Sequence, residues 1–183
     1  PEKEDGTHDH SFIGVDLDLS YPMGEAPQHD AVQSMLEMAV ELEFGAPGYE
    51  LATSIETGQL LVVPITVTSL TAHNLPSGTS FSREAWVESV IKHNGEIIYS
   101  SGKIETNSSL LNREEESLLL FTSFFLNEFA DTTMSIMDTY DIINETLPAL
   151  GTRYHLYEVE LPAGITGEIE IEIRMRFRAL TPL

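Results

Sequence analysis

The segment EIEIEIRMRFRA, residues 168–179, alternates apolar and charged side chains without interruption. Successive side chains of a β-strand point to opposite faces, so one face of this segment is apolar and the other carries only Glu and Arg. Each buried apolar side chain would stabilise the fold by roughly 1.5–3 kcal/mol. The segment therefore predicts a long strand that lies on a core. For its three arginines, Arg174, Arg176 and Arg178, pairing with acids on a neighbouring strand is favoured over an anion site.

The same period of two recurs along the chain, in residues 40–44, 61–68, 83–93, 96–101 and 153–161, and residues 117–125 form a nearly continuous apolar run of strand type. Asn94-Gly95 separates two of these segments and predicts a hairpin, because both positions of its turn take positive φ. Pro64 cannot donate a ladder hydrogen bond, so its strand is expected at a sheet edge or with a bulge.

One short helix is predicted over residues 30–38, with Asp30 as its cap. The strands that follow indicate an all-β fold, a two-sheet antiparallel immunoglobulin-like sandwich. We expect an irregular N-terminal arm, residues 1–30, followed by a β-sandwich domain, residues 31–183.

Composition removes several classes of function. The 183 residues include 9 Lys and Arg against 30 Asp and Glu, a formal charge of −21, and no cysteine. So few cations exclude a nucleic-acid binder, and no apolar run is long enough to span a membrane. Without cysteine the chain has no disulfide and no covalent haem attachment of its own. No hydrolase or nucleotide-binding motif is found, so we expect a protein that is not an enzyme.

Two groups of residues are candidates for chemistry. His8 and His10 lie on one side of an extended chain and form a candidate zinc or copper site, although a solvated N-terminal segment is the favoured explanation for them. The second group is the stretch AHNLPSG, residues 72–78, with Arg83 and Trp86. It predicts a fixed loop at one end of the sandwich. There His73 either binds a ligand or only hydrogen-bonds the loop backbone, and Trp86 is either exposed or a core aromatic.

These stretches resemble the β-sandwich domain at the C-terminal end of bacterial multihaem c-type cytochromes. That family shows a "GH-x-L/F-P-S/T-G … R … W" loop, a hairpin and then "SG", which residues 73–86 and 94–102 match, with Ala72 in place of the usual glycine. The elements HSFIG, residues 10–14, and RFRALTP, residues 176–182, are similar to further motifs of the family.

The resemblance implies a haem-free part of a longer electron-transfer protein, periplasmic or extracellular, with its haem c in an upstream part. The domain would pack against the haem-bearing module of the same polypeptide and contact a redox partner protein. His10 would be the candidate distal haem ligand, and His73 a second ligand or a donor to a haem propionate. Arg83 would pair with a propionate.

Two other functions stay open. One is a secreted immunoglobulin-like module that binds carbohydrate or protein, with Tyr21, Tyr49, Trp86 and Tyr99 as stacking aromatics; burial of Trp86 would argue against this use of it. The other is a small metal-binding protein that uses His8, His10 and His29.

Overall fold

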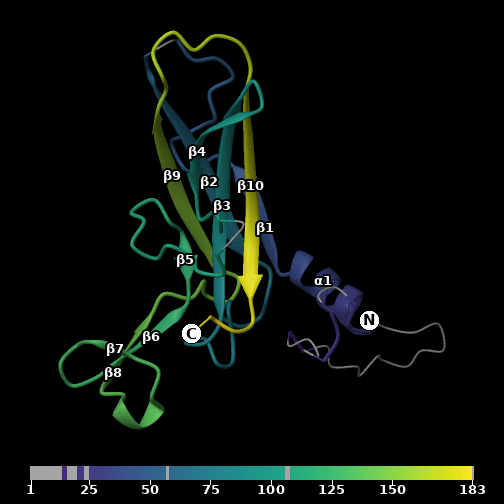
Figure 1. The fold of residues 1–183 in the computed structure, drawn as a ribbon, viewed down its shortest axis with the longest axis vertical. Helices are drawn as coiled ribbons and strands as arrows, with labels where there is room; N and C mark the ends of the chain where they lie inside the picture. The colour runs from purple at the N-terminus through teal and green to yellow at the C-terminus, as the bar shows by residue number, and fades with distance from the viewer. Residues whose placement is uncertain (1–13, 16–19, 23–24, 57, 106–107, 183) are drawn as a thin grey trace. The chain divides into compact units, whose positions relative to one another are not determined.

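The computed structural model describes residues 14–15, 20–22, 25–56, 58–105 and 108–182 (Figure 1). The chain packs as two compact units, Pro1–Ala39 and Val40–Leu183. The first holds the helix α1 (His29–Glu37), in which Asp30 lies inside the first turn. Asp30 is therefore not the cap: the helix begins one residue earlier, and Gln28 occupies the cap position without a side-chain bond. The division into an arm of residues 1–30 and a domain of residues 31–183 stays a prediction.

Two antiparallel sheets face each other in the second unit (Figure 1). One has the order β1-β2-β9, made of β1 (Val40–Phe44), β2 (Leu60–Ser69) and β9 (Thr152–Glu160). The other has the order β10-β3-β4, made of β10 (Ile169–Arg178), β3 (Glu84–His93) and β4 (Glu96–Ser101). The short strand β5 (Leu120–Phe121) also pairs with β3, at Ala85 and Trp86. The predicted all-β sandwich is confirmed. Among the described residues, no helix is long and apolar enough to cross a bilayer.

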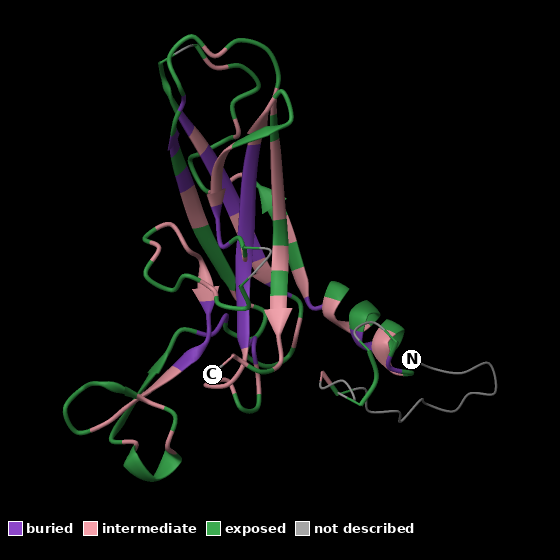
Figure 2. Ribbon diagram, in the orientation of Figure 1, coloured by how far each residue is buried: buried purple, intermediate pink, exposed green. Residues whose placement is uncertain are grey.

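The core lies between the two sheets and follows the alternation in the sequence (Figure 2). Val63, Ile65 and Val67 of β2 are fully buried, and Tyr157 of β9 is buried with them. β10 pairs with β3 along its whole length, and its isoleucines, Met175 and Phe177 pack against this core. Asn94 and Gly95 take φ values of 52° and 82°, which confirms the hairpin turn.

The prediction for Pro64 is wrong, because β2 is the central strand of its sheet. The carbonyl of Pro64 accepts a hydrogen bond from the backbone N–H of Gly45, so its nitrogen faces the same side. The partner strand β1 ends at Phe44, opposite Ile65. The missing donor of Pro64 therefore costs no ladder bond.

The single strand predicted over residues 117–125 is also wrong, because the run divides at Thr122 into β5 and β6 (Ser123–Leu126). The Thr122 hydroxyl lies 3.1 Å from the Ser80 carbonyl and 2.9 Å from the Arg83 carbonyl and fixes this break. β6 joins a third sheet in the order β7-β6-β8, with β7 (Thr132–Thr133), the 3-10 helix η1 (Ile136–Asp138) and β8 (Asp141–Asn144). We call residues 123–144 the lobe.

The face of β3 that points away from the core carries an ion-pair network with β10. Glu84, only 2% exposed, pairs with Arg113 at 2.5 Å and with Arg178 at 3.3 Å. Glu88 pairs with Arg176 at 2.8 Å. The predicted pairing of the three arginines with acids of a neighbouring strand is confirmed, since Arg174 also lies 4.0 Å from Glu88.

Replacing Glu84 with Gln should lower the free energy of unfolding by about 3 kcal/mol, because the largely buried guanidinium of Arg178 would lose its carboxylate partner. The measurement is urea denaturation of the 183-residue chain. The control is Glu170→Gln, whose carboxylate is exposed and 4.0 Å from Lys92, and which should cost less than about 1 kcal/mol. Equal losses in the two variants would contradict the importance of the buried pair.

Candidate functional site

The loop of residues 70–83 joins β2 to β3, and its middle is fixed to a distant segment of the chain. Leu75 and Leu147 exchange two backbone hydrogen bonds of 2.8 Å, and both side chains are buried. The Asn74 side chain donates to the Thr146 hydroxyl at 3.1 Å and accepts from the Ala149 N–H at 3.3 Å. The cis peptide bond Leu75-Pro76 follows. The predicted fixed loop is therefore present.

His73 stands exposed on this loop. Its Nδ1 lies 3.1 Å from the carbonyl of Asn74, as expected for the tautomer in which Nδ1–H donates. An imidazole held in this way presents the lone pair of Nε2 outward, the arrangement common in metal-ligating histidines. The hydrogen bond to the loop backbone, one of the two expectations for His73, is therefore present, and its role as a haem ligand stays a prediction.

Arg83 closes the same loop from its other end. Its Nη1 donates to the carbonyl of Ser77 at 2.8 Å. A Cβ at Gly78, where φ is +71°, would lie 2.9 Å from this nitrogen. The guanidinium therefore fits against the loop because residue 78 has no side chain. Its role toward a haem propionate stays a prediction.

Trp86 is a core aromatic, 4% exposed, so the stacking role considered for it in a sugar-binding module is wrong. Its Nε1 donates to the carbonyl of Gly102 at 2.8 Å, and the Arg178 guanidinium lies 5.2 Å from its ring centre. Tyr99 is half-buried, whereas Tyr21 and Tyr49 are exposed.

Gly102 makes this arrangement possible. A Cβ at this position would lie 2.5 Å from the Val87 carbonyl and 2.9 Å from Cδ1 of Trp86. Its φ of +67° is also one that side chains disfavour. The glycine after Ser101 is therefore required for the close approach of the chain to the indole ring.

His8 and His10 lie outside the described residues, so the metal site and the haem ligand predicted there stay predictions. Within the described part of the chain, no group of three or more His, Asp or Glu side chains could hold a metal ion. Nδ1 of His29 lies 3.2 Å from a carboxylate oxygen of its neighbour Asp30. Of the three predicted haem-contacting residues, the structure describes His73 and Arg83, both on the loop between β2 and β3.

His155 is the histidine that belongs to the core. It is half-buried on β9, its ring lies 4.6 Å from that of Tyr157, and its Nε2 is 3.0 Å from the carbonyl of Ser117. Burial lowers the pKa of His155 below its usual 6.5, and the hydrogen bond to Ser117 partly opposes this shift. This imidazole is therefore a neutral structural group and no candidate ligand.

No family model and no curated protein matches the chain. A solved structure is similar: a penta-heme cytochrome c552 from Thermochromatium tepidum, with a TM-score of 0.59 and 14% sequence identity. The match covers 82% of this chain and 34% of the cytochrome. Over the matched region the chain shares its fold with part of that cytochrome. It spans about a third of the length of that cytochrome, and at this identity the likeness concerns the fold alone.

Replacing Gly102 with Ala should cost at least about 2 kcal/mol more than replacing Gly164 with Ala. Both glycines have positive φ, +67° and +80°, and share the cost of a left-handed alanine, but nothing lies within 4 Å of a Cβ at Gly164. The additional loss at Gly102 measures the clash with backbone and indole. Thermal or urea unfolding of both variants gives the difference, and similar losses would refute the close approach.

The stability of the chain should fall as the pH drops below about 6.5, and His155 should contribute to this loss. The unfolded imidazole takes up a proton near 6.5, whereas the folded one does so only at a lower pH. The unfolded state thus binds more protons in this window, and stability rises with pH. In urea titrations between about pH 7.5 and pH 5, His155→Gln should flatten the dependence of stability on pH. An unchanged slope in His155→Gln would exclude the contribution.

Proposed function

We propose that this chain is a non-catalytic, haem-free β-sandwich of a multihaem electron-transfer protein and packs against haem-bearing modules of the same polypeptide. The observation that carries the proposal is the fold shared with a penta-heme cytochrome over 82% of this chain. The loop motif of residues 73–86 points the same way, because it resembles the corresponding domain of multihaem cytochromes. The location that follows is periplasmic or extracellular.

In this function His73 and His10 are the candidate axial ligands of a neighbouring haem. When bound, the haem supplies one-electron transfer, and a neutral imidazole on its iron keeps that iron low-spin. The chain's own part is to hold the imidazole. Asn74 does this for His73, since its side chain and its backbone carbonyl fix the loop and the ring. Arg83 would add a cation for a propionate beside the loop.

The test uses the full-length gene product that contains this chain. We expect a haem-type absorption spectrum and C-x-x-C-H motifs outside the segment described here. His73→Ala or His10→Ala should convert one haem from low spin to high spin, seen by electron paramagnetic resonance, whereas His29→Ala should leave the spectrum unchanged. Adding imidazole should restore the low-spin signal in the variant that removed the ligand.

Two results would overturn the proposal at different levels. A full-length product without haem would remove the electron-transfer function altogether. Haem spectra that are the same in His10→Ala, His73→Ala and the wild type would leave the domain as a packing module and remove both histidines as ligands.

A further inference from the structure

The lobe of residues 123–144 exposes large apolar side chains to an extent that its size does not explain. Met137 is 92% exposed, Tyr140 80% and Phe129 76%. Met134, Ile136, Ile142 and Ile143 are also exposed. Single exposed apolar residues are ordinary, but a group of this kind on one small element marks an interaction site.

The lobe has no core of its own beyond its first residue. Every described residue from Phe124 to Asn144 is exposed or half-buried (Figure 2). It is fastened at its root, where the ring of Phe125 stacks on Phe81 at 4.3 Å and the hydroxyls of Ser123 and Ser80 are 2.8 Å apart. A small sheet without a buried face is marginal in water. The sandwich therefore presents these strands, and no described residue of the unit Val40–Leu183 covers them.

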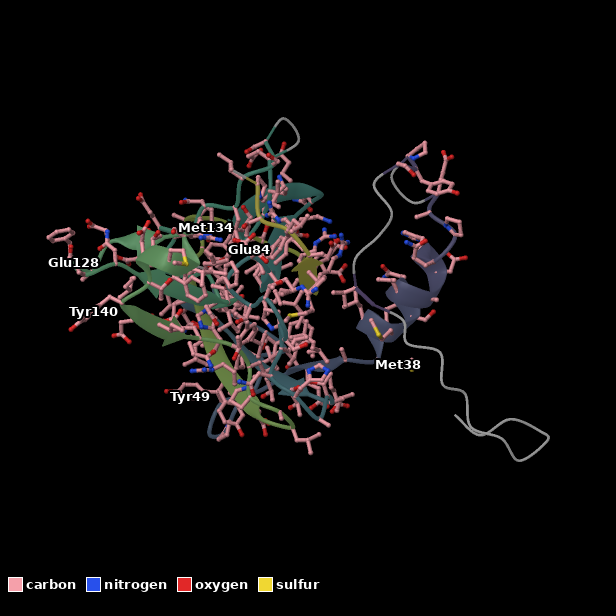
Figure 3. All side chains as sticks on the ribbon, turned by 90° about the horizontal axis from the view of Figure 1, so that it is seen from below. Met38, Tyr49, Glu84, Glu128, Met134 and Tyr140 are labelled. Carbon is pink, nitrogen blue, oxygen red and sulfur yellow. The ribbon has the colours of Figure 1, made fainter. Side chains whose placement is uncertain are left out.

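Three of the exposed side chains line one hollow of about 440 Å³. Phe129, Met137 and Tyr140 supply its apolar part, and Glu128 and Asp138 supply carboxylates beside them. Figure 3 shows Glu128 and Tyr140 at the outer end of the lobe. A flexible methionine that lines the same hollow as two aromatic residues adapts to different apolar side chains, and aromatic rings also attract a cation.

The charge of the lobe identifies what can cover it. Residues 123–144 contain four acids, Glu128, Asp131, Asp138 and Asp141, and no Lys, Arg or His. A second copy of the chain would bring another charge of −21 and the same acids to the contact, and like charges across an interface are unfavourable. Anionic lipid is repelled for the same reason. A basic surface with an apolar centre satisfies both the apolar side chains and the carboxylates.

We propose that the lobe is a docking surface for a basic partner protein, which inserts apolar side chains at Phe129, Met137 and Tyr140 and places lysines or arginines beside Glu128 and Asp138. Contacts of this type combine an apolar anchor with a charged border. The inference does not depend on haem and holds whether or not the proposed electron-transfer function does.

The test measures binding of the 183-residue chain to a synthetic amphipathic peptide of leucine and lysine, about 18 residues long so that it can form a helix on binding. Isothermal titration calorimetry gives the Kd. We expect Met137→Ser with Tyr140→Ser, and separately Glu128→Gln with Asp138→Asn, to raise the Kd at least about tenfold. The control is Leu110→Ser with Leu180→Ser, which removes exposed leucines elsewhere and should leave the Kd within about twofold.

Two further peptides separate the parts of the proposal. A peptide with serine in place of leucine tests the apolar anchor, and one with glutamate in place of lysine tests the basic border. Both should bind much more weakly than the leucine–lysine peptide, and added salt should weaken the latter. The second pair of variants keeps every apolar side chain, so it tests the site even if the serine variants unfold.

Several outcomes would overturn the proposal. The first is a leucine–lysine peptide that does not bind, or that binds the lobe variants and the control variant alike. Equal binding of the serine–lysine peptide would reduce the interaction to charge alone. Sedimentation that shows a dimer of the chain, dissociated by Met137→Ser with Tyr140→Ser, would assign the surface to a second copy instead.

Discussion

The ion pairs of the buried Glu84 carboxylate are the interaction on which the face of β3 that points away from the core depends. Burying a charge is costly unless it is paired, and here two guanidinium groups, of Arg113 and Arg178, meet one carboxylate that is 2% exposed. The three residues come from separate parts of the chain: the start of β3, the connection between β4 and β5, and the end of β10. Their contact holds the connection between β4 and β5 over β3, where Trp86 is buried. A central strand buried on both faces follows from it.

The same network shapes the surface of the molecule. Five of the nine cations, Lys92, Arg113, Arg174, Arg176 and Arg178, take part in ion pairs along β3 and β10. The remaining four cations are too few to neutralise the acids elsewhere in the chain. The net negative charge therefore lies mainly on the loops and the lobe. The arginines of β10, which the sequence placed on one face, therefore serve the fold, while the acidic lobe faces solvent.

The sequence predicts those parts of the fold that are determined by residues close to one another in the chain. Alternation identifies β2, β9 and β10, and Asn94-Gly95 identifies the hairpin, because these signals are local. The prediction for Pro64 fails because its strand is central, yet the neighbouring strand β1 ends opposite Ile65, so at Pro64 no partner needs the missing N–H. Residues 117–125 mislead because the Thr122 hydroxyl binds the carbonyls of Ser80 and Arg83, which are distant in sequence. Residues 126–144 of the lobe are less regular in sequence, since their apolar side chains have no core to face.

The motifs that suggested a cytochrome domain have physical explanations within the fold. Gly78 leaves space for the Arg83 guanidinium, and Gly102 allows the close approach of the chain to the Val87 carbonyl and Trp86. His73 differs from these residues: its ring is exposed, and only Nδ1 is engaged in the described structure. Since packing does not account for that imidazole, it is the described residue whose chemistry can distinguish a haem-contacting domain from a sandwich that shares only its architecture.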